Sequence, residues 1–328
     1  MSLPIYTKVL DDTKLSNFEI APIQQAITLA RLQNGDVLLV KDVKDKQVYA
    51  VNLSKAFNTQ FVDAIDAYNR HNLLNSSNKE LLTITKYSWD QFVQPVKESY
   101  PHIAAGTNFI AHADEVGLEH KPFLFPKLSH TTPWNADVKK ATRLDYEIEL
   151  CAVTLKQHSK NSPSALGYFI CGDFTDRWKL ISKINTNLPM GQTGFPQAKG
   201  GETRLPIGAL LVIPSNEEFY KEFDLKLYVN NDLRQSTSAS LMVWSPQTIL
   251  DNALADCETP YYNDNEVISI SDCQSIPSRT ILLTGTPEGV LFKVATILNP
   301  LSYLAVGDTV VSYGKYLGFM KNNIASND

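Results

Sequence analysis

The feature that most constrains the fold is a series of short β-rich runs that follows about residue 108. The runs are RLDYEIELCAVTL, LGYFICGDF, ALLVIP, FDLKLYVN, RTILLTG and DTVVSYG. Their β-branched and aromatic content is typical of strands, and one helix-like stretch, residues 240–257 with Pro246 near its start, interrupts them. They lack the strand–helix rhythm of a doubly wound sheet. We therefore expect a β-rich α+β fold with a mixed, mainly antiparallel sheet or roll.

The beginning of the chain predicts a smaller unit. Short β-rich runs at 27–32, 36–43 and 47–53 are split by NG and DK turns, which is the pattern of a β-meander. Apolar residues then recur at helical spacing within 56–74, and the polar stretch NSSNKE follows at 75–80. We expect a small N-terminal domain over residues 1–90, containing this meander and one helix, and a larger domain over 91–328.

Charge and cysteine usage narrow the function classes. The 35 acidic and 30 basic residues are interspersed and give a net charge of -5, which leaves no basic footprint for nucleic acid. No apolar run approaches the roughly 20 residues that span a bilayer, so we expect no membrane partner and a cytoplasmic location. The four cysteines contain no C-x-x-C pair, and we expect reduced, mostly buried thiols at Cys151, Cys171, Cys257 and Cys273.

Two carboxylates stand two residues apart in the run DYEIEL. On a strand, Glu147 and Glu149 would point to the same face. Their mutual repulsion would be relieved by a hard divalent cation, which prefers oxygen ligands. The alternative is that the pair forms the polar face of an exposed strand, which is common.

Two further segments carry acid–base groups. Asp173 ends the apolar run GYFICGD, at the mouth of a buried strand, where acids also serve as turn formers. In NFIAHADEVG, His112 and Glu115 stand three apart and would share one face of a helical turn. A histidine oriented by a carboxylate can act as a general base on water, although such pairs are also ordinary on protein surfaces.

Two glycine-rich loops complete the set. QAKGGETRLPIG carries Lys199 and leads into a strand, and LLTGTPEGV places Gly285 and Thr286 in a tight turn after one. Loops of this kind let backbone donors approach a small anion, although most simply turn the chain. Neither is a phosphate-binding P-loop, and the chain has no G-x-S-x-G nucleophile elbow.

The five motifs, in this order, resemble the fumarylacetoacetate hydrolase superfamily. N-F-x-x-H-x-x-E resembles its lid helix, D-Y-E-x-E-L its metal strand, and G-Y-F-x-x-G-D-F-T-D-R its next acidic segment. A-K-G-G-E-T-R-L-P-I-G and L-T-G-T-P-E-G-V resemble its lysine loop and its Gly-Thr-Pro turn. The resemblance runs from about residue 95 to 315, and the first ninety residues loosely resemble the small N-terminal domain of some members.

The resemblance implies a role for each matched residue. It implies a divalent metal ion, Mg²⁺ or alternatively Mn²⁺ or Ca²⁺, held by Glu147, Glu149 and Asp173. His112 and Glu115 would activate water and Lys199 would stabilise developing negative charge. Thr286, with Gly285, would hold the substrate carboxylate, and Arg177 would have a structural role. The resemblance also implies that 91–328 is a catalytic domain and that the protein is a homodimer.

The implied activity is hydrolysis of a C–C bond in a small β-dicarbonyl acid, such as an acylpyruvate or a fumarylacetoacetate-like acid. The alternatives are decarboxylation, isomerisation or dehydration of a 2-oxo acid at the same site, and a non-catalytic carboxylate-binding homologue. Two departures are Gly172, where the family usually has Asn, and Ala105, where fumarylacetoacetases proper carry an acid. The aromatic residues of the segment between the dyad and the metal strand suggest an apolar substrate tail near Phe123, Phe125 and Trp134.

Overall fold

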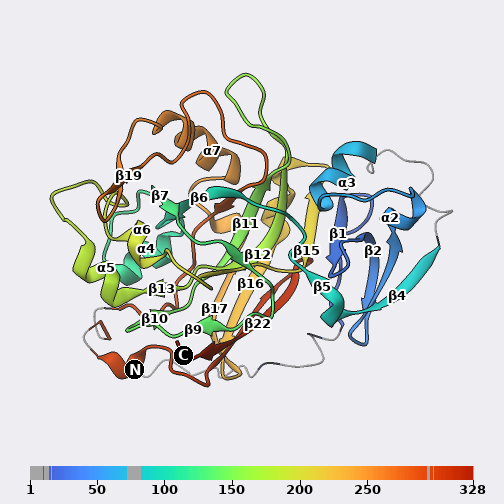
Figure 1. The fold of residues 1–328 in the computed structure, drawn as a ribbon. Helices are drawn as coiled ribbons and strands as arrows, with labels where there is room; N and C mark the ends of the chain where they lie inside the picture. Colours follow the sequence, from blue (N-terminus) through green and yellow to red (C-terminus); the bar gives the residue numbers. More distant parts are fainter. Residues whose placement is uncertain are drawn as a thin grey trace.

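The computed structural model describes residues 17–71, 83–293 and 299–327, together with residues 10, 15, 296 and 297. Its strands (Figure 1) are β1 (Ala26–Leu32), β2 (Val37–Lys44), β3 (Gln47–Asn52), β4 (Ile84–Ser88), β5 (Phe92–Val93), β6 (Ser99–Gly106), β7 (Phe123–Lys127), β8 (Thr131–Thr132), β9 (Val138–Lys139), β10 (Leu144–Asp145), β11 (Ile148–Thr154), β12 (Leu166–Gly172), β13 (Thr175–Asp176), β14 (Leu205–Pro206), β15 (Leu210–Pro214), β16 (Asp224–Val229), β17 (Asp232–Ser238), β18 (Tyr261–Asn263), β19 (Glu266–Ile268), β20 (Thr280–Leu283), β21 (Thr309–Gly314) and β22 (Gly318–Ala325). The α-helices are α2 (Leu53–Ala56), α3 (Ala64–His71), α4 (Ile110–Val116), α5 (Arg177–Lys183), α6 (Phe195–Ala198) and α7 (Pro246–Ala255). The 3₁₀-helices are η2 (Trp89–Gln91), η3 (Glu217–Glu222), η4 (Ala239–Leu241) and η5 (Pro300–Ser302).

The largest sheet has eleven strands. Ten of them follow the order β4-β3-β2-β1-β15-β12-β11-β20-β6-β7, and β5 pairs with β1. Within this sheet β20 and β6 are parallel, whereas the other neighbouring pairs are antiparallel. The prediction of a β-rich α+β fold with a mixed, mainly antiparallel sheet is therefore confirmed.

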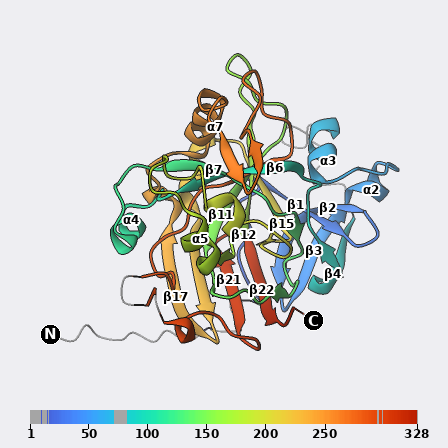
Figure 2. The same cartoon turned by 60° about the vertical axis from the view of Figure 1, so that its left-hand side comes forward.

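A five-stranded sheet, in the order β17-β16-β21-β22-β9, packs against the centre of the large one. Strand β16 contacts β11, and β21 and β22 contact β12. Figure 2 shows β21 and β22 beside β12. Every residue of β11 and of β12 is buried. Strands covered on both faces read as continuous apolar runs, which explains why these two segments do not alternate.

The N-terminal meander is confirmed, and it extends the large sheet. Strand β1 pairs antiparallel with β15 from Ala26 opposite Pro214 to Ala30 opposite Leu210. The expected helix is shorter than its apolar spacing suggests, because α3 begins at Ala64, where the Asp63 carboxylate accepts the Asp66 N–H at 2.9 Å. The polar stretch 75–80 lies outside the described residues, and the division of the chain near residue 90 stays a prediction.

The helix expected around Pro246 is also confirmed. Proline is the first residue of α7, and the preceding Ser245 hydroxyl accepts the Thr248 N–H at 3.1 Å. Proline suits this position because the first helical N–H has no partner within the helix. Within the described ranges, no helix is long and apolar enough to cross a bilayer.

Candidate active site

Three carboxylates meet where β11 and β12 lie side by side. The register pairs Ile148 with Gly172, so Glu147 and Asp173 face each other one step beyond that pair. The Asp173 N–H donates to the Glu147 carbonyl at 2.9 Å and continues the ladder. Glu149 lies two residues from Glu147 and therefore points to the same face. The predicted ligand set is thus brought together by a single strand pairing.

This acidic cluster fits a divalent metal ion. Glu147, Glu149 and Asp173 are buried, and one oxygen of each lies within 4.8 Å of the others. Burial, together with the charges of Asp173 and Glu147, raises the pKa of Glu149 well above its usual value. A hard cation with oxygen ligands would remove this conflict, and the all-oxygen set suits Mg²⁺, Mn²⁺ and Ca²⁺ alike.

Two buried lysines neutralise part of the acidic charge. Lys199 Nζ donates to Glu147 Oε2 at 2.5 Å and to Asp173 Oδ2 at 2.7 Å. Lys127 Nζ donates to the other Asp173 oxygen at 2.6 Å. Burial lowers the pKa of Lys127 to about 8, although the charge of Asp173 opposes that shift. Lys199 was expected at the site, whereas Lys127 was not, and its only signal is a lysine at the end of the apolar run FLFPK.

Arg177 binds one acid of the cluster, Glu147, and is held in turn by Asp145. Its guanidinium donates to Asp145 Oδ2 at 2.8 Å and forms a second, short hydrogen bond with Glu147. Asp145 also accepts the Leu291 N–H at 3.0 Å. Arg177 therefore orients a predicted metal ligand, and Asp145, which sequence reasoning did not select, holds Arg177 in place.

The predicted histidine–glutamate dyad lies on α4. His112 Nδ1 is 3.6 Å from Glu115 Oε2, and His112 is buried in the wall of the same cavity as the acids. Glu115 accepts the Gly289 N–H at 2.9 Å and pairs with Lys293 at 2.8 Å. Burial alone would raise the pKa of Glu115, but the nearby His112 ring, the ion pair with Lys293 and the hydrogen bond from the Gly289 N–H lower it to about 2. The carboxylate beside the imidazole is therefore ionised at neutral pH.

The Gly-Thr-Pro turn binds one of the acids, Glu149, and also forms part of the cavity wall. The Gly285 N–H donates to Glu149 Oε2 at 2.6 Å, and the Thr286 hydroxyl donates to the Ile148 carbonyl at 3.0 Å. Gly285 has a φ of 94°, a conformation in which a side chain would be strained. Thr286 lines the cavity, whereas the Gly285 N–H is already occupied by Glu149. Their binding of a substrate carboxylate stays a prediction.

A cavity of about 200 Å³ opens over these groups. Its polar lining residues include His112, Glu147, Glu149, Lys199 and Thr286. The rest is mainly apolar and includes Val116, Leu118, Phe123, Phe125, Leu180, Ile181, Ile184, Met190, Phe195 and Phe292. The concave shape, with a few convergent polar groups in an apolar wall, is typical of a small-molecule site.

One of the aromatic residues expected at a substrate tail lies elsewhere. Phe123 and Phe125 line the cavity, but Trp134 packs against Trp89 and Phe319 with ring centroids 5.8 and 5.4 Å away. The expectation for Trp134 is therefore wrong, because its side chain turns into the core between the two sheets.

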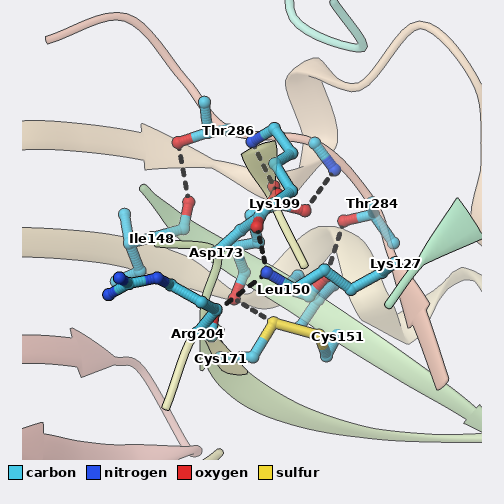
Figure 3. Close-up of a disulfide and its surroundings, with 12 residues drawn as sticks. Lys127, Ile148, Leu150, Cys151, Cys171, Asp173, Lys199, Arg204, Thr284 and Thr286 are labelled. Atoms are coloured by element: carbon cyan, nitrogen blue, oxygen red, sulfur yellow. Dashed lines mark hydrogen bonds and ion pairs between the residues drawn. A yellow bond between two sulfur atoms is a disulfide. The ribbon is translucent and has the colours of Figure 1, made fainter. Parts of the chain in front are cut away.

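The prediction of reduced thiols is also wrong. Cys151 forms a disulfide with Cys171, and Cys257 forms one with Cys273. The first bond joins β11 to β12 beside the lysine and acid groups of the site, as Figure 3 shows. The spacings of 20 and 16 residues carry no recognisable pattern, and the first pairing depends on a strand register that the cysteines alone do not reveal.

Comparisons with known proteins identify relatives of this chain. The family model for the fumarylacetoacetate (FAA) hydrolase C-terminal domain matches residues 101–325. Oxaloacetate tautomerase YisK of Bacillus subtilis (strain 168) is 27% identical over 242 residues, which cover 70% of this chain and 70% of the relative.

Two solved structures illustrate the shared fold. A probable 2-hydroxyhepta-2,4-diene-1,7-dioate isomerase from Mycobacterium abscessus superposes with a TM-score of 0.64 at 22% identity, covering 92% of this chain and 99% of that one. Maleylpyruvate hydrolase from Sphingobium sp. SYK-6, in complex with manganese(II) ion and pyruvate, superposes with a TM-score of 0.61 at 17% identity, covering 92% of this chain and 100% of that one.

Proposed function

The chain belongs to the fumarylacetoacetate hydrolase family, and from that premise we propose that it is a metal-dependent hydrolase that cleaves a C–C bond in a small β-dicarbonyl acid. The observation that carries this proposal is the placement of His112 in one cavity with Glu147 and Glu149. A water-activating base is needed for hydrolysis, and a carboxylate oriented toward it strengthens that base.

The acids define the electrostatics of the reaction. Glu147, Glu149 and Asp173 would hold the divalent ion, which when bound would polarise a substrate carbonyl as a Lewis acid. Lys199 presents its ammonium group to the same cavity and is held there by Glu147 and Asp173. In our proposal it stabilises the negative charge that develops on the substrate oxygen.

The dyad performs the proton transfers. Because Nδ1 of His112 faces Glu115, Nε2 is the ring nitrogen that would take a proton from water. The hydroxide adds to the distal carbonyl carbon, and the C–C bond then breaks with its electron pair moving to the departing enolate carbon. His112 returns its proton to that carbon, so the products are a carboxylic acid and a 2-oxo acid. Glu115 stabilises the imidazolium that forms between these steps.

A second candidate is tautomerisation of a 2-oxo acid, because the relative described above is an oxaloacetate tautomerase. This reaction moves a proton between carbon and oxygen and needs no attacking water. The same dyad could move that proton, so the chemistry of the two candidates differs chiefly in whether water enters the cavity.

The test is turnover by purified protein with Mg²⁺ or Mn²⁺. We expect acetylpyruvate to be cleaved only with metal present, and His112→Ala to reduce the rate by about 10²-fold or more. His120→Ala is the matched control, since His120 is exposed and pairs with the exposed Asp114 at 2.6 Å. Enol–keto exchange of oxaloacetate without any C–C cleavage would instead favour the tautomerase.

Three finer expectations remain part of the proposal: Mg²⁺ as the native ion, a homodimer, and a cytoplasmic location. The all-oxygen ligand set supports a hard ion, and the family resemblance supports the dimer. Metal analysis of protein purified without added ions, and its mass in solution by light scattering, test the first two.

A further inference from the structure

The cavity is lined by two chemically different sets of side chains. Glu147, Glu149 and Lys199 are charged, whereas Leu180, Ile181 and Ile184 form an apolar part of the wall. Leu180 lies in α5, and Ile184 is the residue that directly follows this helix. Because they are four residues apart, their side chains lie on the same face of the helical segment. The same helix begins with Arg177, which binds Glu147. One short helix thus fixes the position of the apolar wall relative to the acidic cluster.

Aromatic rings form a rigid second wall. Phe195 contacts Phe123 and Phe125 with ring centroids 5.0 and 5.2 Å apart. The Phe123 ring fits because two of its neighbours are glycines: a Cβ on Gly106 would lie 2.3 Å from that ring, and one on Gly191 would lie 2.9 Å from it. These contacts form an apolar surface that does not have to be ordered when a ligand binds.

Within the part of the chain that the structure describes, no unpaired lysine or arginine lines the cavity. The described residues that line the cavity include one lysine, Lys199, and one arginine, Arg177, and each already binds two carboxylates. An adjoining hollow carries Lys121, but also Glu119 and Asp256. A second carboxylate on the substrate would therefore lose its water without gaining a partner, which is unfavourable.

From this asymmetry we infer that the substrate is a 2-oxo acid whose tail is apolar and uncharged, an aliphatic or aromatic acyl group of several carbons. This inference rests on the proposed function for the 2-oxo acid head. Its tail lies against Leu180, Ile184 and Phe195. Dianionic acids such as oxaloacetate are poor ligands, which distinguishes this chain from its relative that is a tautomerase of that compound.

Calorimetric binding to the Mn²⁺-loaded protein tests the inference without relying on turnover. The probes are pyruvate, 2-oxobutanoate, 2-oxopentanoate and 2-oxohexanoate, and we expect each added CH₂ to tighten binding by about fourfold. A second comparison uses 2-oxoglutarate and 5-methyl-2-oxohexanoate, in which an isopropyl group replaces the terminal carboxylate. We expect the apolar acid to bind about tenfold or more tightly.

A charge placed in the wall should reverse this preference. Ile184→Arg is expected to weaken the binding of 5-methyl-2-oxohexanoate by about tenfold and to tighten the binding of 2-oxoglutarate. Ser182→Arg is the matched control, because Ser182 lies on the exposed side of the same helix and should change neither affinity. If Ile184→Arg does not fold, Ile184→Ala, which shortens the wall, should weaken only the longer acids.

The outcomes separate this inference from the proposed function. If affinity rises with tail length but acetylpyruvate is not cleaved, the inference about the tail stands and the proposed hydrolase activity is contradicted. Cleavage of acetylpyruvate combined with equal or tighter binding of 2-oxoglutarate overturns the inference and leaves the hydrolase standing. Affinity that does not change with tail length also overturns it.

Discussion

Lys127 and Lys199 hold Asp173 between two ammonium groups. Each lysine binds a different oxygen of the carboxylate, at 2.6 and 2.7 Å, and the side chains of Lys127 and Asp173 are fully buried. A buried carboxylate without compensation would take up a proton and cease to be a metal ligand. The two ammonium groups therefore compensate the buried charge of Asp173 and fix the orientation of its carboxylate.

Replacing Lys127 by methionine should destabilise the fold. The substitution keeps the length of the side chain but leaves Asp173 with one cation instead of two, and breaking a buried pair costs about 3–5 kcal/mol. Urea denaturation without added metal measures the free energy of unfolding. As a control, Lys183→Met breaks the exposed pair with Asp264, 2.9 Å long, and should cost less than about 1 kcal/mol. Equal losses in the two variants would show that Lys127 has no special role.

Glu98 should make the fold sensitive to acid. Burial alone would raise its pKa, but contacts with His102, Thr131 and His130 lower it to about 2. Between about pH 2 and the usual glutamate pKa of 4.5, the folded state therefore binds fewer protons than the unfolded state. The stability contributed by the ionised group is complete above that pH and is lost as the pH falls toward 2.

The expected result is a pH-dependent difference between wild type and Glu98→Gln. The variant should be less stable at pH 7, and the gap should narrow by about pH 3 because the wild type loses its advantage there. Urea midpoints at several pH values measure the gap. Glu258→Gln, at an exposed position, should show no such convergence. A gap that is constant with pH would contradict the assignment.

At this scale, sequence reasoning located the residues that meet in the cavity, because spacing alone places Glu147 beside Glu149 and His112 beside Glu115. It could not locate Lys127 or Asp145. Their partners lie 46 and 32 residues away, so the pairing arises only when the strands and α5 are assembled. Their local sequence is that of an ordinary strand end.

The pairing of β11 with β12 positions both the acids of the site and a disulfide. Cys171 lies opposite Glu149, and Cys151 lies two residues farther along β11, so the bond crosses the ladder diagonally. The second bond, Cys257 to Cys273, joins the end of α7 to the segment before β20. Strand positions were predictable from apolar runs, but which strand lies beside which was not, and the disulfides depend on that.

The two disulfides should differ in their reaction with dithiothreitol. Cys151 and Cys171 have no exposed surface, whereas Cys273 is exposed and Cys257 is half-buried. A reductant must reach a sulfur atom, so only the second bond should open in the native protein. Iodoacetamide should then add to two cysteines, and to four after unfolding, as counted by mass spectrometry.

The informative control omits the reductant. With the disulfides formed, even the unfolded protein should not be labelled. Labelling of four cysteines under that condition would restore the original expectation of free thiols. It would also favour the cytoplasmic location, because disulfides persist mainly in oxidising compartments.

Across the whole molecule, the N-terminal meander shares its core with the rest of the chain. Buried side chains of β1, β2 and β3 belong to the same apolar cluster as those of β11 and β12. The figures show the blue strands beside β15, which is the strand that β1 extends (Figure 1). Periodicity predicted the meander but not this docking, because pairing between strands 180 or more residues apart leaves no local pattern.

We therefore expect one cooperative thermal transition, with equal calorimetric and van't Hoff enthalpies. A bidentate ion pair crosses the proposed boundary: Arg279 donates to both oxygens of the buried Asp63 at 2.7 and 3.0 Å. Arg279→Met should lower the free energy of unfolding by about 3 kcal/mol and the midpoint by roughly 5 °C, and it should still give one transition. Two transitions in the wild type would make residues 1–90 an independent domain. Two transitions in the variant alone would mean that this single ion pair couples the two parts.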